Sequence, residues 1–154
     1  MKCRILVIFS VLPCVLAGMA ATSAKAADSA VSMSVQVIEP WTDSGVYVNA
    51  GDSVSVTASG VAVFGSGDKG TKPAGAQGCA GTDDDSIPPG PFLAPGLTCR
   101  SLIGRIGDGV PFEIGAGTSF TATSSGELDL GVNDNYFPDN HGTWTVTTTT
   151  VSLP

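Results

Sequence analysis

The alternation of apolar and polar residues with a period of two constrains the fold of this chain more than any other feature. It occurs in four segments, residues 31–37, 53–58, 127–132 and 143–147. Successive side chains of a β-strand point to opposite faces of a sheet, so this alternation is typical of strands with one buried face. No segment after residue 26 has apolar residues at the spacing of an amphipathic helix. We therefore predict an all-β chain, folded as a jelly-roll-type antiparallel β-sandwich.

Residues 1–26 have the composition of a secretory signal peptide. Basic residues open the segment, an uncharged apolar stretch occupies residues 5–20, and Ala-Lys-Ala at residues 24–26 has the small-x-small form that signal peptidase recognises. The apolar stretch has about sixteen residues, whereas a membrane-spanning helix needs roughly 20. We therefore predict cleavage near Ala26, one domain over residues 27–154, and a secreted or periplasmic location without membrane insertion after cleavage.

The predicted mature chain is strongly acidic. Loss of Lys2, Arg4 and Lys25 with the signal peptide lowers the formal charge from −7 to −10, because that segment holds no acidic residue. Binding to nucleic acid requires a basic surface that neutralises phosphates. We therefore predict no nucleic-acid partner, and we regard cations and neutral polyols as better-suited ligands.

Cys79 and Cys99 are the two cysteines that remain after removal of the signal peptide. Two cysteines in an oxidising compartment most often pair. The bridge would close a loop of about 20 residues and stabilise the fold by roughly 3 kcal/mol in the chain-entropy model. A zinc site is disfavoured, because the chain has no C-x-x-C spacing and a single histidine, His141. We therefore predict a Cys79–Cys99 disulfide.

The segment 130–144, LGVNDNYFPDNHGTW, concentrates oxygen-bearing side chains in one turn between two predicted strands. Asp134, Asp139 and Asn140 can converge there with backbone carbonyls of the irregular stretch, including that of Phe137. Hard oxygen ligands, some of them anionic, suit Ca²⁺, which takes six to eight such ligands in proteins. By composition alone, an Asn- and Asp-rich turn in a β protein more often bonds its own backbone as an Asx-turn. The residues alone therefore leave both interpretations open.

The sequence offers no recognisable catalytic motif. Ser66 does not lie in a G-x-S-x-G pattern, and the chain has a single histidine, so a Ser-His triad is disfavoured. A glycosidase needs a pair of carboxylates at a set separation, which so acidic a chain does not exclude. We predict that the protein is not an enzyme.

Three stretches, taken in order, resemble the PA-IL-like galactose-binding lectin family. They are VNAGDSVSV with ASG over residues 48–60, CRSLIGRIG with VPF over residues 99–112, and ND with DNxGxWxV over residues 133–146. Together they span over two thirds of the predicted mature domain. The resemblance implies a jelly-roll β-sandwich that binds carbohydrate. It also implies one Ca²⁺ ion in the loop before the last strand, coordinated directly by a pair of sugar hydroxyls.

The resemblance also assigns roles to individual residues. It implies that Asp134 binds Ca²⁺ and touches the sugar, and that Asp139 and Asn140 replace a pair of asparagine ligands. It further implies that Phe64 contributes a backbone carbonyl. We therefore predict a Ca²⁺ site made by the side chains of Asp134, Asp139 and Asn140 and the backbone oxygens of Phe64 and Phe137, with Asp134 and Asp139 also contacting the sugar.

The sequence departs from this family in the long Gly- and Pro-rich loop over residues 65–98. The family orients galactose with a histidine and a glutamine, but this loop has no histidine, and Gln77 is the side chain that we predict to contact sugar there. We expect a specificity other than simple galactose recognition, with weak single-site binding strengthened by several copies, as in a homo-oligomer. The alternative is a secreted structural or protein-interaction β-sandwich in which Ca²⁺ only stabilises the loop.

Overall fold

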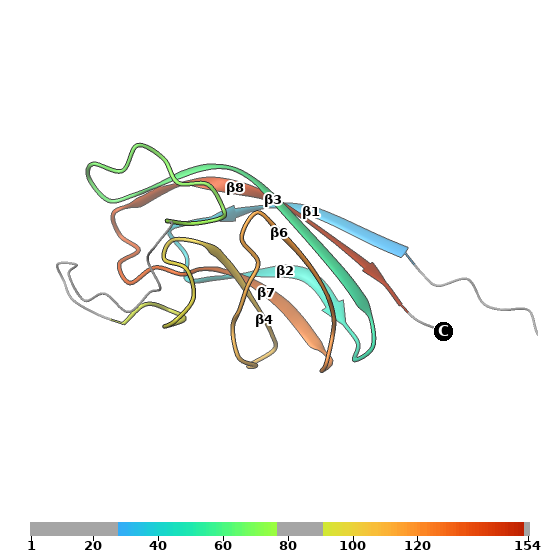
Figure 1. Ribbon diagram of the computed structural model, residues 1–154. Coiled ribbons are helices and arrows are strands. Elements are labelled where there is room, and N and C mark those ends of the chain that lie inside the picture. The colour runs from blue at the N-terminus through green and yellow to red at the C-terminus, as the bar shows by residue number, and fades with distance from the viewer. Residues whose placement is uncertain (1–27, 77–90, 153–154) are drawn as a thin grey trace, which may run out of the picture.

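The computed structural model describes residues 28–76 and 91–152, and these form two antiparallel sheets packed face to face (Figure 1). The strands are β1 (Asp28–Gln36), β2 (Trp41–Val48), β3 (Ser53–Phe64), β4 (Leu102–Ile106), β5 (Phe112–Glu113), β6 (Gly117–Thr121), β7 (Gly126–Val132) and β8 (Asn140–Val151). One sheet has the order β1-β8-β3-β6 and the other has the order β2-β7-β4-β5. The predicted all-β, antiparallel β-sandwich is therefore confirmed.

Some sequence predictions concern residues that lie outside these two ranges. The signal peptide over residues 1–26, Gln77 and Cys79 are among them, so cleavage, sugar contact by Gln77 and the Cys79–Cys99 disulfide stay predictions. Within the described ranges, no helix is long and apolar enough to cross a membrane.

Strands β3 and β8 fix the position of the loops at one end of the sandwich. They pair along their whole length, from Ser53 opposite Val151 to Phe64 opposite Asn140. The predicted alternation is present in β3, where Val54 and Val56 are fully buried between more exposed neighbours. Because the register is continuous, the chain leaves β3 at Phe64 beside the point where it enters β8 at Asn140.

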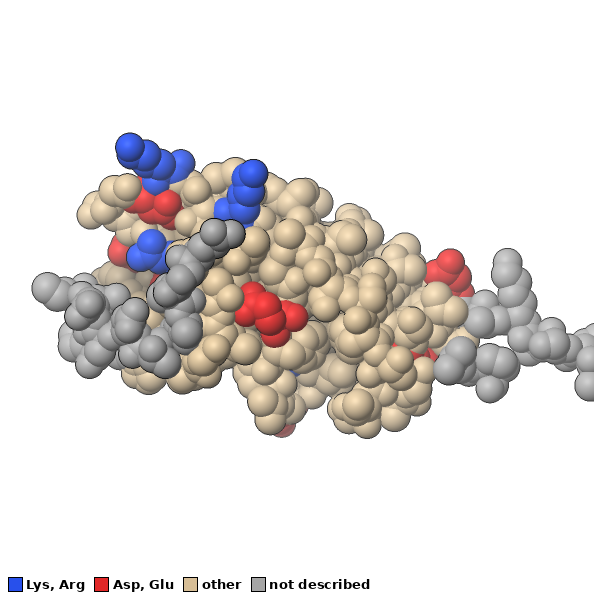
Figure 2. All heavy atoms as spheres, in the orientation of Figure 1, with Lys and Arg blue, Asp and Glu red and all other residues tan. Residues whose placement is uncertain are grey.

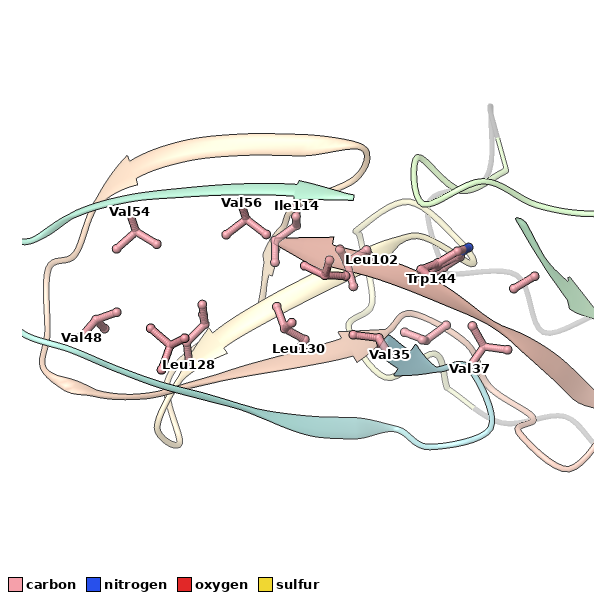
Figure 3. Packing of buried hydrophobic residues seen from close by; sticks show 14 of the residues in the cluster. Val35, Val37, Val48, Val54, Val56, Leu102, Ile114, Leu128, Leu130 and Trp144 are labelled. Atoms are coloured by element: carbon pink, nitrogen blue, oxygen red, sulfur yellow. The ribbon is translucent and has the colours of Figure 1, made fainter. Parts of the chain in front are cut away.

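The hydrophobic core lies between the two sheets. Val54 and Val56 of β3 face Leu128 and Leu130 of β7 across it, and all of these side chains are fully buried (Figure 3). Burial of each such side chain contributes about 1.5–3 kcal/mol relative to leaving it exposed. The alternating strands therefore supply the main stabilisation of the sandwich and hold its end loops in place.

Trp144 anchors β8 close to these end loops. Its ring centroid lies 5.8 Å from that of Phe64, and its Nε1 donates a hydrogen bond to the carbonyl of Thr71 at 3.3 Å. Gly60 lies opposite Trp144 in β3, with φ +111°, and a Cβ there would lie 3.2 Å from the carbonyl oxygen of Thr143. Glycine at this position lets β3 pass close to β8 next to the large indole.

Candidate metal and ligand site

A polar hollow of about 220 Å³ lies at the end of the sandwich where β3 ends and β8 begins. It is lined by Phe64, Gly65, Ser66, Arg100, Asp134, Asn135, Tyr136, Asp139 and Asn140. These residues come from three separate segments: the end of β3, the loop before β4, and the loop between β7 and β8. The hollow is smaller than the roughly 300–1,000 Å³ of pockets that enclose drug-sized ligands. Its size therefore suits an ion together with part of a small polar ligand.

Asp134 is a buried carboxyl in the wall of this hollow, with only 5% of its surface exposed. Burial raises the pKa of Asp134 above its usual value of 3.8. Hydrogen bonds from Asn140 and Asn135 and the charge of Arg100 oppose this rise, whereas the charge of Asp139 adds to it. Desolvation disfavours the charged form of a carboxyl unless a cation or donors compensate. The surroundings of Asp134 therefore leave its negative charge incompletely stabilised.

Asn140 is the second buried polar residue of the hollow. Its Nδ2 donates hydrogen bonds to Asp134 Oδ2 at 2.7 Å and to the carbonyl of Val37 at 3.1 Å. Both partners are acceptors, so they fix the orientation of the amide. Its Oδ1 is buried and has no hydrogen-bond partner among the described residues. A buried oxygen without a partner costs about 1–3 kcal/mol, and such an atom calls for a ligand that accepts its lone pairs.

Asp139 lies at the exposed rim of the same hollow. Its Oδ2 approaches Gly65 so closely that a Cβ at that position would lie 2.9 Å from it. The Gly65 amide also donates a hydrogen bond to the Asp139 carbonyl at 3.4 Å. Gly65 has φ +78°, a conformation that residues with a Cβ rarely adopt. Glycine at position 65 thus admits the Asp139 carboxylate to the hollow.

The two residues predicted to supply backbone oxygens to the ion, Phe64 and Phe137, lie in different places relative to the hollow. Phe64 lines the hollow, next to Asn140 in the register of β3 and β8. Phe137 is not among the lining residues. Its carbonyl accepts a hydrogen bond from the backbone N–H of Asn140 at 3.1 Å, and its side chain packs against the core. The structure therefore brings four of the five predicted ligand residues to one hollow and leaves Phe137 in the turn beside it.

Asn133 holds the neighbouring loop against the site. It is fully buried, and its Oδ1 accepts a hydrogen bond from the Ala94 amide at 2.8 Å. Its Nδ2 donates to the carbonyls of Leu97 and Thr98 at 3.1 and 3.0 Å. The amide of Arg100 donates in turn to the Asn133 carbonyl at 2.6 Å. All the polar groups of Asn133 are used in this way, so it positions Arg100 beside Asp134.

The oxygen atoms around the hollow fit Ca²⁺. Buried Asp134, rim residue Asp139 and the unpartnered Oδ1 of Asn140 are hard ligands, and calcium sites are completed by backbone carbonyls and further oxygens. Within residues 28–76 and 91–152, no three His, Cys, Asp or Glu residues gather as a metal cluster. A site with only a pair of carboxylates therefore depends on amide and carbonyl oxygens, which is typical of calcium and unlike zinc.

Sequence reasoning missed other residues that line the hollow. Ser66, Asn135 and Tyr136 add polar groups, and Arg100 adds a positive charge. Asn135 and Tyr136 fall inside the oxygen-rich segment, so their presence is foreseeable from the chain. Arg100 lies far from that segment in sequence, and nothing local to Cys99-Arg100-Ser101 indicates its position.

A second, larger hollow of about 520 Å³ lies at the open edge of the sandwich, between β5 and β6. Phe112 and Phe120 pack edge to face in its wall, with ring centroids 4.9 Å apart. The one charged residue that lines it, Glu113, accepts a hydrogen bond from the Thr98 amide at 3.0 Å. Because the unpartnered buried oxygen lies in the smaller hollow, we take the smaller hollow as the candidate site.

Comparisons with known proteins support a lectin-like fold. A scan against protein-family models finds no match, and a search of curated proteins also finds none. Among solved structures, the chain is similar to the N-terminal domain of EclA, a PllA-like lectin, with 25% sequence identity and a TM-score of 0.59. The match covers 78% of this chain and 95% of that domain. This chain is therefore similar to a lectin domain over most of its length, which supports a lectin-like family without singling out the PA-IL-like one.

Proposed function

We propose that this chain is a secreted carbohydrate-binding domain in which Ca²⁺ holds a pair of hydroxyls of a sugar, as in PA-IL-like lectins. The observation that carries the proposal is the buried, unpartnered Oδ1 of Asn140 beside the buried carboxyl of Asp134. A cation would partner the Asn140 oxygen and offset the cost of burying the Asp134 charge. The likeness to a lectin domain supports sugar as the second ligand.

In this proposal, Asp134, Asp139 and Asn140 hold the ion with their side chains, and Phe64 supports it with its backbone oxygen. The ion would supply direct coordination of sugar hydroxyls, which are neutral and need no charged partner. Calcium takes six to eight oxygen ligands, so this small protein set leaves positions for a diol. The carboxylates of Asp134 and Asp139 would also accept hydrogen bonds from those hydroxyls.

The proposal includes no catalytic step. It includes export with cleavage near Ala26, and modest affinity at each site because a small hollow makes few contacts with one sugar. Several copies on one surface, or in a homo-oligomer, would raise the apparent affinity by increasing the effective concentration of sites. Binding to clustered glycans is therefore the expected mode of action.

A glycan array tests the proposal against the structural alternative. We expect the exported protein to bind glycans in calcium and to lose them in EDTA. Asp134→Asn should abolish this binding, whereas Asp108→Asn, which makes the same change of charge at an exposed turn between β4 and β5, should retain it. Calcium binding without any calcium-dependent glycan signal would favour a structural or protein-interaction domain.

A further inference from the structure

Arg100 lies in the wall of the candidate site in a backbone conformation that arginine rarely adopts. Its φ is +57°, and no other residue besides glycine has a positive φ in the described part of the chain. Glycine would adopt this conformation without the steric conflict that a Cβ introduces. Strained residues of this kind persist only where the surrounding structure holds them, and they cluster at ligand sites.

The guanidinium of Arg100 contacts the described part of the fold only weakly, through its charge on Asp134 and Asp68 and its position over the Phe64 ring. It lies 5.9 Å from the ring centroid of Phe64, and it makes no hydrogen bond or ion pair within residues 28–76 and 91–152. Arg105 shows the contrast, because it bonds Asp129 at 2.9 Å and stacks 4.4 Å from the ring of Trp41. A guanidinium carries five N–H donors in a planar fork. At Arg100, which lines the hollow, no described residue accepts a hydrogen bond from these donors.

The acidic residues near Arg100 are already occupied. Asp68 accepts hydrogen bonds from the amides of Phe64 and Gly70 and from the Thr71 hydroxyl, each at 2.9 Å. The Asp134 carboxylate accepts a hydrogen bond from the side-chain amide of Asn140. In the proposed function, Ca²⁺ balances the charges of Asp134 and Asp139. With the ion in place, none of these three carboxylates is free to pair with Arg100.

Charged side chains of both signs lie at the end of the molecule that carries the hollow. Most of the Lys and Arg side chains visible in Figure 2 gather at the end of the sandwich that carries the loop after β3, with acidic side chains beside them. Of the described basic residues, Arg100 is the one whose side chain lines the hollow, so the preference for an anionic ligand is assigned to Arg100 alone.

We propose that Arg100 makes the site selective for acidic sugars, by pairing its guanidinium with the carboxylate of a uronic acid whose hydroxyls are held by the ion. The inference rests on the proposed function and names its ligand class. The planar fork of arginine matches a carboxylate in a bidentate pair, and such charge-assisted bonds are stronger than those to neutral hydroxyls. For a partly exposed site, we expect a preference of roughly tenfold over the neutral parent sugar.

Titration calorimetry of the exported protein in calcium tests this inference. The probes are galacturonate with galactose, and glucuronate with glucose. We expect at least one uronate to bind roughly tenfold more tightly than its parent sugar, and we expect added salt to reduce the difference because salt screens the ion pair. Arg100→Gln should bring the ratio of the two affinities close to one. Lys69→Gln, which removes an exposed charge outside the hollow, should keep it.

Different outcomes separate this inference from the function on which it rests. Equal affinity for acidic and neutral sugars in the native protein would overturn the role of Arg100 while leaving sugar binding intact. A preference that survives in Arg100→Gln would also overturn it, because the ion itself would then bind the carboxylate. Loss of binding for every sugar, with or without calcium, would refute both. Thermal melts of each variant establish that the protein compared is folded.

Discussion

Calcium should stabilise this fold through Asp134. Without calcium, replacement of Asp134 by asparagine should leave the free energy of unfolding unchanged or raise it. Burial raises the pKa of Asp134 above 3.8. A carboxyl whose pKa is raised by folding adds stability below its unfolded pKa, and that contribution is lost as the pH rises through the folded value. At neutral pH without calcium, the charge of Asp134 therefore lowers the free energy of unfolding, and a neutral amide in its place should relieve this.

The size of the calcium effect follows from binding linkage. A ligand that binds only the folded state, at about a hundred times its Kd, adds roughly 2.7 kcal/mol to the free energy of unfolding. The ion would partner the Asn140 Oδ1, whose lack of a partner costs about 1–3 kcal/mol, and would offset the charge of Asp134. In a domain of this size, 1 kcal/mol shifts Tm by about 4 °C. Calcium should therefore raise Tm by about 10 °C.

Circular dichroism melts at neutral pH measure this effect. The samples are the native protein, Asp134→Asn and the control Asp108→Asn, each in EDTA and in excess calcium. We expect the native protein and the control to respond alike, and Asp134→Asn to show no response and a midpoint in EDTA equal to or above the native one. A native midpoint that calcium leaves unchanged would refute the site. A calcium response that persists in Asp134→Asn would place the ion elsewhere.

Two further predictions concern the residues around the hollow. Arg100→Gly should raise the free energy of unfolding in EDTA by about 1 kcal/mol, because glycine removes the strain of a positive φ, and urea denaturation measures this. A free energy of unfolding below that of the native protein would show that the arginine side chain stabilises the fold. Burial acts to raise the pKa of Asp68, but hydrogen bonds from the Gly70 and Phe64 amides and the Thr71 hydroxyl, with the charge of Arg100, together hold it below 3.8. Asp68→Asn should therefore reduce stability by about 1 kcal/mol at neutral pH, and the difference from the native protein should shrink as the pH falls below 3.8; a constant difference would argue against it.

The strands that sequence patterns predicted are those with one buried and one exposed face. The segments 31–37, 53–58, 127–132 and 143–147 lie largely within β1, β3, β7 and β8. Strand β4 escaped the same reasoning because Leu102 and Ile103, although adjacent, are both fully buried. In the sequence, a strand buried on both faces is a short run of apolar residues. Periodicity alone cannot distinguish such a run from a segment of a buried helix.

The candidate site was predictable only in part, because its residues are separated along the chain. The oxygen-rich loop before β8 carries Asp134, Asp139 and Asn140 within a few residues, so their type and spacing left a cation site open beside an Asx-turn, and only the resemblance to PA-IL-like lectins favoured Ca²⁺. Phe64 and Arg100 reach the same hollow only through the register of β3 with β8 and the hydrogen bonds of Asn133. Phe137 was expected as a ligand from the irregularity of its segment, which does not reveal that its carbonyl closes a turn with Asn140.

Three unfavourable features of the described structure lie around one small hollow, and this coincidence is the strongest argument for a ligand there. Asn140 has a buried oxygen without a partner, Asp134 has a charge opposed by burial, and Arg100 has a strained backbone. Elsewhere β3 pairs with β8 without a break and the core between the sheets is apolar, so the residues chosen there agree with the fold. Natural proteins concentrate such conflicts at functional sites, where a bound partner resolves them. A cation would offset the buried charge of Asp134 and partner the Asn140 oxygen. An anionic group on the sugar would pair with the Arg100 side chain that the strained backbone holds at the hollow.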